Sequence, residues 1–310
     1  MTALAAVASY LPETRVPIGE LAEDLGLGER GIRLFQRFHG LSEVCQEPEG
    51  DLATLLGHAL DSLAELRGQE HRVRYVLYAR AIAVGVPYPL NPLHEVTARF
   101  GLGHALAFTV THHSCASALL ALDAAGRLLA ADQDPDALAL VLAGEKTFTK
   151  DAQLVPETSI FGEGASACLV SADGPRDRLL SYVSSQRGDF DSWQQDPVEV
   201  ATRYTKEYPE CLAEVVLAAV AEAGLQLSDI GLILPHNVNS VSWRRLCKRI
   251  EYPLEQVVLD NVEHTGHCFA ADAFINYRTA ADTGRLQPGQ RYLIAAAGLG
   301  ATFSAMVFEH

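Results

Sequence analysis

Basic residues are scarce in this chain of 310 residues. It has 24 Lys and Arg against 39 Asp and Glu, which gives a formal net charge of −15. A nucleic-acid-binding surface, or a surface that docks on an anionic membrane, needs an excess of cationic side chains. The composition therefore argues against both kinds of partner. Any local basic cluster needs its own explanation in so acidic a chain.

Targeting and membrane-spanning patterns are also lacking. The first fifteen residues, MTALAAVASYLPETR, contain no basic region before their apolar stretch. That stretch ends after about ten residues, which is too short for a membrane span. The sequence predicts neither a secretory signal nor a membrane anchor, and we expect a cytoplasmic protein.

Paired cysteine motifs are missing as well. The six cysteines stand at positions 45, 115, 168, 211, 247 and 268, and no two form a CxxC pair. This scatter is typical of reduced thiols and argues against a disulfide framework or a structural zinc site. Hydrophobic residues make up 48% of the chain and charged residues 20%, which indicates a globular protein with one large or two medium domains.

Short apolar runs alternate with Ala-rich helical stretches, which predicts an α/β protein with a mainly parallel, buried sheet. The expected strands are 3–9, 75–79, 107–111, 137–143, 165–171, 231–234, 256–259, 292–297 and 305–308. The expected helices are 49–67, 115–131, 208–224, 240–250 and 269–284. We expect two halves, 1–174 and 175–310, and an irregular exposed excursion at 184–200.

Cys115 stands where a predicted strand turns into a predicted helix. The run Phe108-Thr109-Val110-Thr111 leads through two histidines to the cysteine, and an Ala/Leu helix pattern follows at once. Free backbone N–H groups and the macrodipole at a helix N-terminus favour thiolate over thiol. Cys115 is therefore a candidate nucleophile. Structural cysteines outnumber reactive ones, so Cys115 taken alone is more typical of a buried structural cysteine.

Three later segments carry further candidates. His236 follows the buried strand 231–234, and ligands gather at the carboxyl ends of strands in open α/β sheets. His267 stands at the start of an Ala-rich helix, after Gly266, which permits close backbone approach. The Gly-rich turn around Gly300 follows the strand 292–297 and could present a backbone N–H to an oxyanion.

A metal site is the main rival interpretation of these residues. The possible ligands are His112, His113, Cys115, His264, His267 and Cys268. No acidic ligand is grouped with them and no zinc-type spacing is present, so we expect no metal.

In their order and spacing these segments resemble the β-ketoacyl-acyl-carrier-protein synthase III family of thiolase-fold condensing enzymes. The resemblance also rests on Ser9-Tyr10-Leu11-Pro12-Glu13 and Phe161-Gly162-Glu163-Gly164-Ala165. It covers most of the chain. It implies a thiolase fold in which two similar halves form a five-layered αβαβα sandwich, usually as a homodimer.

The resemblance also implies roles for individual residues. Cys115 would accept the acyl group, His236 would be the second catalytic residue, and Gly300 with the backbone of Cys115 would form the oxyanion hole. The third position departs from the family. Synthase III enzymes carry asparagine there, whereas this chain has Thr265-Gly266-His267, closer to the Cys-His-His set of elongating synthases. His267 would take the third role.

Two reactions are compatible with a Cys-His-His set. Two histidines that donate to the carbonyl of a malonyl-type extender on a carrier protein would stabilise the enolate formed by decarboxylation, and C–C condensation would follow. A histidine acting as base towards an alcohol or amine would instead give an ester or amide. We expect condensation in specialised, polyketide- or fatty-acid-like metabolism such as antibiotic biosynthesis, and keep acyl transfer and a catalytically silent partner subunit as alternatives.

The identity of the acyl donor depends on two further segments. Arg244, Arg245, Lys248 and Arg249 form a basic run that resembles the family's contact with acidic carrier proteins, although such runs can also be merely solubilising. The Trp and Arg with which the family holds coenzyme A have no clear counterparts. Gly28–Leu41 keeps only Arg37 of that pattern, and Leu154–Glu157 stands where the family has an arginine. We therefore expect an acyl-carrier-protein thioester as substrate and no bound cofactor.

Overall fold

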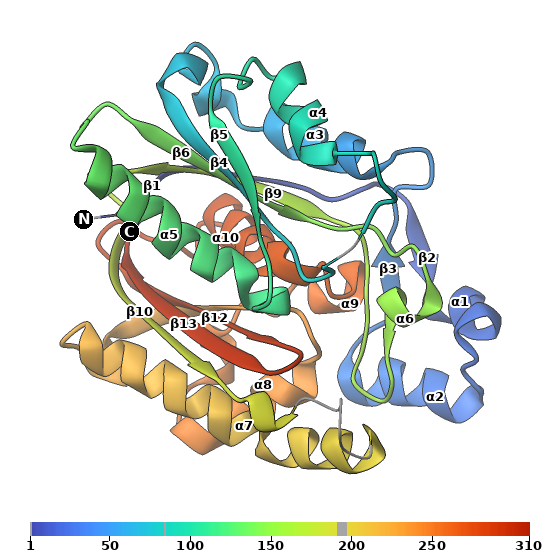
Figure 1. The fold of residues 1–310 in the computed structure, drawn as a ribbon. Helices are drawn as coiled ribbons and strands as arrows, with labels where there is room; N and C mark the ends of the chain where they lie inside the picture. Colours follow the sequence, from blue (N-terminus) through green and yellow to red (C-terminus); the bar gives the residue numbers. More distant parts are fainter. Residues whose placement is uncertain (1, 84, 191–196) are drawn as a thin grey trace.

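The computed structural model describes residues 2–83, 85–190 and 197–310. Its chain folds into five layers, in which helices cover both outer faces and fill the centre between two sheet regions (Figure 1). Both chain ends lie beside the long central helix.

Nine strands form one continuous sheet in the order β11-β12-β13-β10-β1-β9-β6-β4-β5. Their bounds are β1 Ala3–Tyr10, β4 Val73–Ala79, β5 Leu106–Val110, β6 Leu138–Gly144, β9 Ala165–Ser171, β10 Arg178–Gln186, β11 Ile230–Pro235, β12 Arg291–Gly298 and β13 Thr302–Glu309. Two short pairs lie outside it, β2 Arg15–Pro17 with β3 Glu43–Cys45 and β7 Leu154–Val155 with β8 Ser159–Ile160.

The α-helices differ greatly in length, from one turn to seven. Their bounds are α1 Ile18–Leu25, α2 Glu29–Arg33, α3 Leu52–Asp61, α4 Pro92–Arg99, α5 Ser117–Asp132, α6 Lys150–Gln153, α7 Pro197–Glu222, α8 Ser240–Ile250, α9 Val262–Thr265 and α10 Asp272–Asp282. A π-helical turn, Leu34–His39, continues α2.

Three apolar clusters hold the five layers together. Leucines of α3 and α4 pack on one face of β4, β6 and β9. In the centre, α5 and α10 lie between the two sheet regions, with Leu119, Leu122 and Phe274 fully buried. On the far side α7 and α8 cover β11 to β13, where Trp243 is the largest fully buried side chain. Burial of this apolar surface provides the main favourable term in folding.

The two sheet regions contain strands from different parts of the chain. Strands β1, β4, β5, β6 and β9 come from residues before 174, whereas β10 to β13 come from residues after 175. One register pair, Ala3 with Arg178, connects β1 to β10. Away from that point the regions separate, and α5 and α10 fill the space between them (Figure 1).

Eight of the nine expected strands are present within three residues at each end. The expected mainly parallel sheet is wrong, because three pairings between the described strands of the sheet are parallel and five are antiparallel. The expected strand 256–259 is wrong. A 3₁₀ turn, Leu254–Gln256, stands there, followed by a single bridge between Val257 and Ile233. The segment runs beside β11 too briefly to form a ladder.

The region between the expected halves is more regular than predicted. Strand β10 extends to Gln186 and a 3₁₀ turn covers Gly188–Phe190, while residues 191–196 of the expected excursion lie outside the described residues. Helix α7 begins at Pro197, well before the expected start at 208, and continues through Pro209. Proline normally favours a helix boundary because it has no N–H to donate. In α7, packing against the sheet on both sides of Pro209 overrides that preference.

Among the described residues, one segment, Ser114–Asp132, is long and apolar enough to cross a membrane by length and composition. It is the central helix α5 with its first 3₁₀ turn, and 56% of its most apolar window is buried inside the molecule. Its apolar side chains pack on both sheet regions, which is the arrangement of a core helix.

Candidate active site

Cys115 lies at the junction of β5 and α5, as the sequence predicted. The chain leaves β5 at Val110 and enters a 3₁₀ turn, Ser114–Ala116, which leads directly into α5. His112 and Ser114, which both precede Cys115, have left-handed backbone, with φ of 72° and 48°. Non-glycine residues adopt this conformation at a cost, and such strain gathers at functional sites. The turn leaves Cys115 only 5% exposed.

His267 reaches the site from the loop between α9 and α10. Its backbone N–H donates to the Ile160 carbonyl at 3.0 Å, which fixes it beside β8. The loop backbone passes so close to β8 that the residue before His267 must be glycine. Gly266 has a φ of 68°, and a Cβ there would lie 2.9 Å from the Ile160 oxygen. The expected close backbone approach at Gly266 is therefore confirmed.

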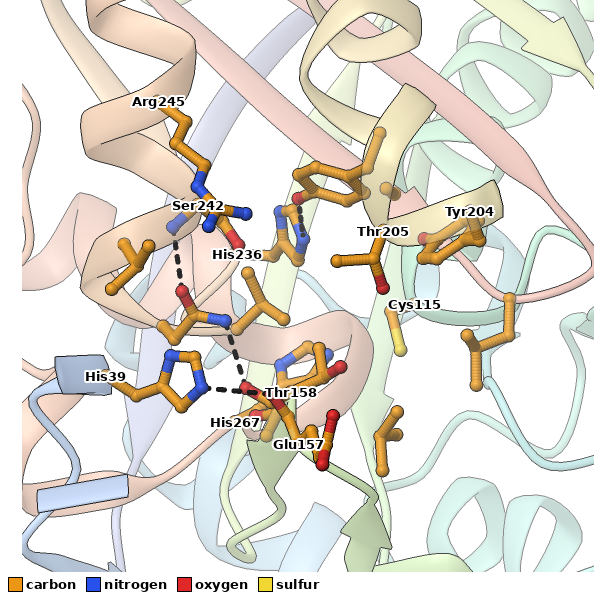
Figure 2. Close-up of a pocket in the computed structure, with 18 of the residues that line it drawn as sticks. His39, Cys115, Glu157, Thr158, Tyr204, Thr205, His236, Ser242, Arg245 and His267 are labelled. Atoms are coloured by element: carbon orange, nitrogen blue, oxygen red, sulfur yellow. Dashed lines mark hydrogen bonds between the residues drawn. The ribbon is translucent and has the colours of Figure 1, made fainter. Parts of the chain in front are cut away.

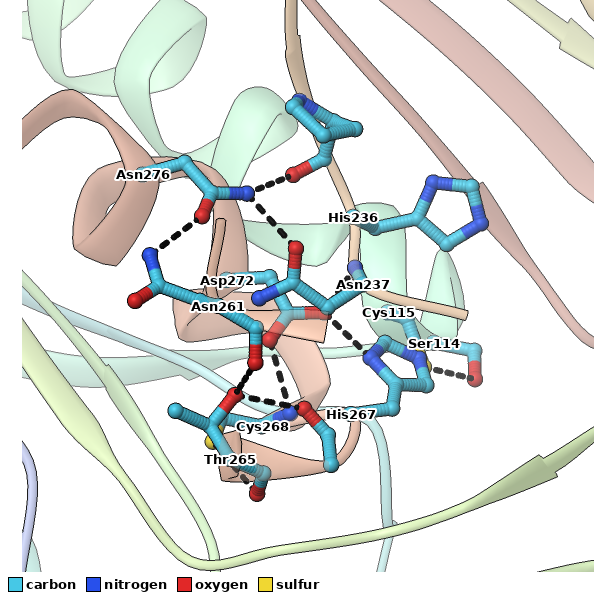
Figure 3. Close-up of polar contacts among 12 residues, drawn as sticks. Ser114, Cys115, His236, Asn237, Asn261, Thr265, His267, Cys268, Asp272 and Asn276 are labelled. Atoms are coloured by element: carbon cyan, nitrogen blue, oxygen red, sulfur yellow. Dashed lines mark hydrogen bonds and ion pairs between the residues drawn. The ribbon is translucent and has the colours of Figure 1, made fainter. Parts of the chain in front are cut away.

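Asp272, the first residue of α10, holds the imidazole of His267 (Figure 3). Its Oδ2 contacts His267 Nδ1, and both side chains are almost completely buried. Its Oδ1 also accepts the Cys268 N–H at 2.7 Å. A carboxylate at a helix N-terminus is further stabilised by the macrodipole. Because the carboxylate only accepts, Nδ1 carries the proton and Nε2 is left for the cavity.

The charge state of His267 follows from its neighbours. Burial alone lowers the pKa of His267, but the Asp272 carboxylate and the Cys115 sulfur, which hydrogen-bonds the imidazole, raise that pKa to about 10. His267 is therefore an imidazolium at neutral pH. An imidazolium beside a cysteine favours the thiolate form.

His236 follows the end of β11 and lines the same cavity as Cys115 and His267. Its ring centroid is 5.7 Å from that of His267. Burial, and then the charge of His267, lower the pKa of His236 to about 3. The Trp243 indole donates to the His236 carbonyl at 2.9 Å and the Tyr208 hydroxyl lies 2.9 Å from Nε2. His236 is therefore neutral and held from two sides.

These groups surround one cavity of about 240 Å³. Cys115, His236 and His267 line it together (Figure 2). Arg245 and His39 lie at the end away from Cys115 in this view. The structure thus brings the three residues singled out from the sequence to a single space.

A second cavity, of about 410 Å³, also reaches Cys115. The two cavities share the wall formed by Cys115, Val155, Phe161 and Leu299. Phe161 and Phe269 pack with the cysteine in a small apolar cluster. Cys115 is therefore open to two cavities, and both are apolar near it. The first cavity becomes polar at its far end, where Arg245 and His39 lie.

The Gly-rich turn between β12 and β13 packs directly on the cysteine loop. A Cβ at Gly298 would lie 2.0 Å from the His113 carbonyl oxygen, so only glycine permits this approach. Leu299 lines both cavities, and Gly300 follows it with a φ of 122°. The turn that carries Gly300 thus packs against the loop that carries Cys115.

The six possible metal ligands are dispersed. Only Cys115 and His267 share the main cavity. His264 is exposed and pairs with Glu43, and Cys268 contacts Cys45 with 3.7 Å between sulfurs. Within the part of the chain that the structure describes, no three His, Cys, Asp or Glu side chains are placed to hold a metal ion.

The predicted basic run lies along α8, near the mouth of the main cavity. Arg245 lines the cavity and Lys248 is exposed. Arg244 donates to the Phe38 carbonyl at 3.0 Å. Arg249 forms a two-bond ion pair with Glu210, so much of its charge is neutralised.

Sequence reasoning missed Asp272 and Tyr208. Asp272 carried a usable signal, because it is an acidic residue in an otherwise Ala-rich helix start, five residues after His267. Tyr208 carried none, since its contact with His236 spans 28 residues and depends on how α7 packs.

Comparisons with known proteins agree with this fold. The family model for the C-terminal part of 3-oxoacyl-acyl-carrier-protein synthase III matches residues 220–310. A β-ketoacyl-acyl-carrier-protein synthase III of Paramagnetospirillum magneticum is 29% identical, with 96% of each chain covered. Among solved structures, the acyltransferase ChlB3 has a TM-score of 0.86 at 20% identity, covering 99% of this chain and 97% of its own. The 3-oxoacyl synthase III of Aquifex aeolicus has a TM-score of 0.85 at 19% identity over the full length of both chains.

The layered architecture is the thiolase fold of these solved structures, and Cys115, His236 and His267 line one cavity within it. The chain is therefore similar to the β-ketoacyl-acyl-carrier-protein synthase III family of condensing enzymes, over its C-terminal part by the family model and over nearly its full length by these relatives. The predicted recognition and fold class are confirmed.

Proposed function

We propose that this enzyme captures an acyl group on Cys115 and transfers it, without decarboxylation, to an alcohol or amine acceptor. The observation that carries the proposal is the contact between Asp272 and His267 Nδ1. It makes Cys115, His267 and Asp272 a nucleophile, a base and a group that orients the base. This is the arrangement that acyl transfer to a hydroxyl or amine requires.

The mechanism follows from the charge states. The Cys115 thiolate attacks the carbonyl of the donor thioester, and the departing thiolate takes the proton from His267 Nε2. His267, now neutral, removes the proton of the acceptor as the acceptor attacks the acyl-cysteine. Collapse of the second tetrahedral intermediate restores the Cys115 thiolate and the His267 imidazolium. Asp272 stabilises the positive charge of His267 in the free enzyme, before acylation and after discharge.

In this proposal the oxyanion of each tetrahedral intermediate is held by the backbone N–H groups of Cys115 and Gly300. The packing of Gly298 on the His113 carbonyl supports the placement, because it keeps the turn against the cysteine. Loss of one such donor typically costs on the order of 10²-fold in rate.

Decarboxylative condensation with a malonyl-type extender is the second candidate. It is favoured by the presence of His236 and His267 on one cavity, with ring centroids 5.7 Å apart. For this reaction both rings must donate to the same thioester carbonyl. A silent partner subunit is less favoured, since the chain keeps its nucleophile and both histidines.

An acyl-carrier-protein thioester is the proposed donor. Arg244, Arg245 and Lys248 supply positive charge near the cavity mouth of an acidic protein. The segments that would hold a coenzyme A nucleotide also border this cavity. They present Leu34, His39 and Glu157 there, where the family pattern has Trp and Arg.

The proposed assembly is a cytoplasmic homodimer that is active in specialised metabolism. Each chain consists of two halves, 1–174 and 175–310. The distribution of strands supports the division, and the edge strand β5, with Leu106 61% exposed, supports self-association. Edge strands with exposed apolar side chains readily pair with another chain.

The shared first step is tested by incubating the protein with acyl-carrier-protein thioesters and measuring the mass of the Cys115 peptide. We expect an acyl adduct on Cys115, no adduct in Cys115→Ala, and an unchanged adduct in Cys247→Ala, which removes a buried thiol of α8. No adduct with any acyl donor would refute the proposed function.

The second step is tested on the isolated acyl-enzyme. Added alcohols or amines should discharge it as esters or amides. Discharge only by malonyl-carrier protein, with release of carbon dioxide, would instead assign condensation.

A further inference from the structure

Each ring nitrogen of His236 has one partner. Nδ1 lies 3.4 Å from the Ala295 carbonyl oxygen, and Nε2 lies 2.9 Å from the Tyr208 hydroxyl. A carbonyl oxygen can only accept, whereas a phenol can donate. The arrangement that satisfies all three groups places the proton on Nδ1 and directs the Tyr208 O–H to the lone pair of Nε2.

Both groups keep these protons at neutral pH. The pKa of His236 is lowered to about 3, mainly by burial, so the ring carries one proton. Burial raises the pKa of Tyr208 well above its usual value of 10, so the phenol stays a donor. The charged group that faces His236 most directly is His267, and its positive charge opposes a second proton on His236.

Packing keeps the pair in place. Tyr208 contacts the Phe303 ring, with 5.8 Å between centroids, and the Trp243 ring packs edge-on against His236 at 5.6 Å. Tyr208 is 7% exposed and His236 3%. Rotation of either ring would break these contacts as well as the hydrogen bond.

The consequence concerns the choice between the two reactions of this site. Enolate formation from a malonyl-type thioester needs two N–H donors on one carbonyl. His267 would supply one through Nε2 when it is an imidazolium, because Asp272 occupies its Nδ1. His236 offers a lone pair already engaged by Tyr208 and therefore supplies none.

We propose that Tyr208 is a positioning residue that determines reaction specificity, because it holds His236 as a hydrogen-bond acceptor and withholds the second donor that decarboxylation requires. This inference rests on the proposed acyl transfer through Cys115. It makes the alcohol or amine, and not a malonyl-type extender, the acceptor class of the site.

The direct test measures the tautomer of His236 in the intact protein by ¹⁵N NMR with labelled histidine. His236→Gln identifies the resonances of this ring. We expect a protonated Nδ1 and an unprotonated Nε2. A proton on Nε2 in the unmodified protein would overturn the proposal, whatever the behaviour of any variant.

The functional test is Tyr208→Phe, which removes one oxygen atom. The Ala295 carbonyl already accepts the His236 backbone N–H at 3.2 Å, so the long Nδ1 contact holds the tautomer weakly by itself. A malonyl thioester carbonyl should then draw the proton to Nε2. We expect release of carbon dioxide from malonyl-carrier protein to rise about tenfold or more over the unmodified enzyme.

Tyr252→Phe is the matched control. It removes another buried tyrosine hydroxyl from the same core layer, one that donates to the Ile230 carbonyl at 3.0 Å. We expect it to change neither the His236 tautomer nor carbon dioxide release. An acylated Tyr208→Phe enzyme that releases carbon dioxide no faster than the unmodified one would refute the proposal.

The two proposals fail separately. Absence of an acyl adduct on Cys115 would refute the acyl-transfer function, while the tautomer of His236 would still be measured in the same protein.

Discussion

Asp272 shows how one side chain can set the chemistry of its neighbours. It accepts hydrogen bonds from the His267 ring and from the backbone N–H of Cys268, and the Asn237 N–H points at the same carboxylate. It therefore connects the loop that carries His236 to the loop that carries His267 (Figure 3). The charge of His267 and the proton on its Nδ1 both depend on this carboxylate. At this scale, the acid and base properties of the site depend on a residue that need not touch substrate.

Asp272→Asn should lower the rate of Cys115 acylation by on the order of 10²-fold. Asparagine cannot stabilise the imidazolium, so the pKa of His267 falls from about 10 towards its ordinary value of 6.5. The folded-state pKa is raised, so the contribution of this charge to stability is fully present below pH 6.5 and is lost as pH rises through about 10.

The pH profile of acylation provides the measurement. In the unmodified enzyme acylation should decline as pH rises towards about 10, because His267 loses the proton that it gives to the leaving thiolate. In Asp272→Asn the decline should begin at lower pH. An unchanged rate and profile in a folded Asp272→Asn protein would contradict the triad.

Helix α8 combines two tasks on two faces. Its apolar face buries Trp243, Leu246 and Ile250 against the sheet. Its other face carries the basic run beside the cavity mouth. The N-terminus is capped by the Asn239 side chain, which accepts the Ser242 N–H at 2.7 Å. Fixed packing on one face thus holds the positive charges of the other at a constant distance from the cavity.

Lys248→Glu should raise the KM for an acyl-carrier-protein thioester roughly tenfold, because it reverses a charge that the acidic carrier would approach. The KM for a short acyl thioester without carrier should stay unchanged. Arg249→Gln is the control, since Glu210 already neutralises Arg249. An equal effect of Lys248→Glu on both substrates would place its role in the cavity and not in carrier docking.

At the scale of the whole molecule, the sheet ends differently on its two sides. Strand β5 forms one edge and pairs only with β4 among the described strands. Its residues Leu106, Ala107 and Phe108 are exposed or half-buried. A second copy could continue the sheet at this edge and cover those side chains. The other edge strand, β11, differs, because some of its side chains are buried in one apolar cluster with those of α8.

Leu106→Asp should convert a homodimer to a monomer of 33.5 kDa, because a charge at the paired edge would be buried without a partner. Light scattering after size-exclusion chromatography measures the mass. Leu217→Asp is the control, since Leu217 is also exposed, at 45%, but lies on α7 in the opposite outer layer. A monomeric unmodified protein would refute the proposed homodimer.

The sequence predicted much of the architecture because its signals are local. Buried strands such as 165–171 are mainly apolar runs, and they appear as expected. Strand β10 was missed because RLLSYVSSQ is polar and half-buried. The predicted start of helix α7 was too late, because Pro209 favours a helix boundary and only tertiary packing overrides that preference.

What the sequence alone determined is the candidate nucleophile and the order of the segments around it. The change from strand to helix at Cys115 is set by residues within a few positions, and Gly266 and Gly298 permit the close approaches that the site needs. Only the tertiary structure decided how the histidines are used. Asp272 keeps His267 protonated, and the Tyr208 hydroxyl hydrogen-bonds Nε2 of His236. Both contacts depend on the packing of α10 and α7, which no local sequence pattern predicts.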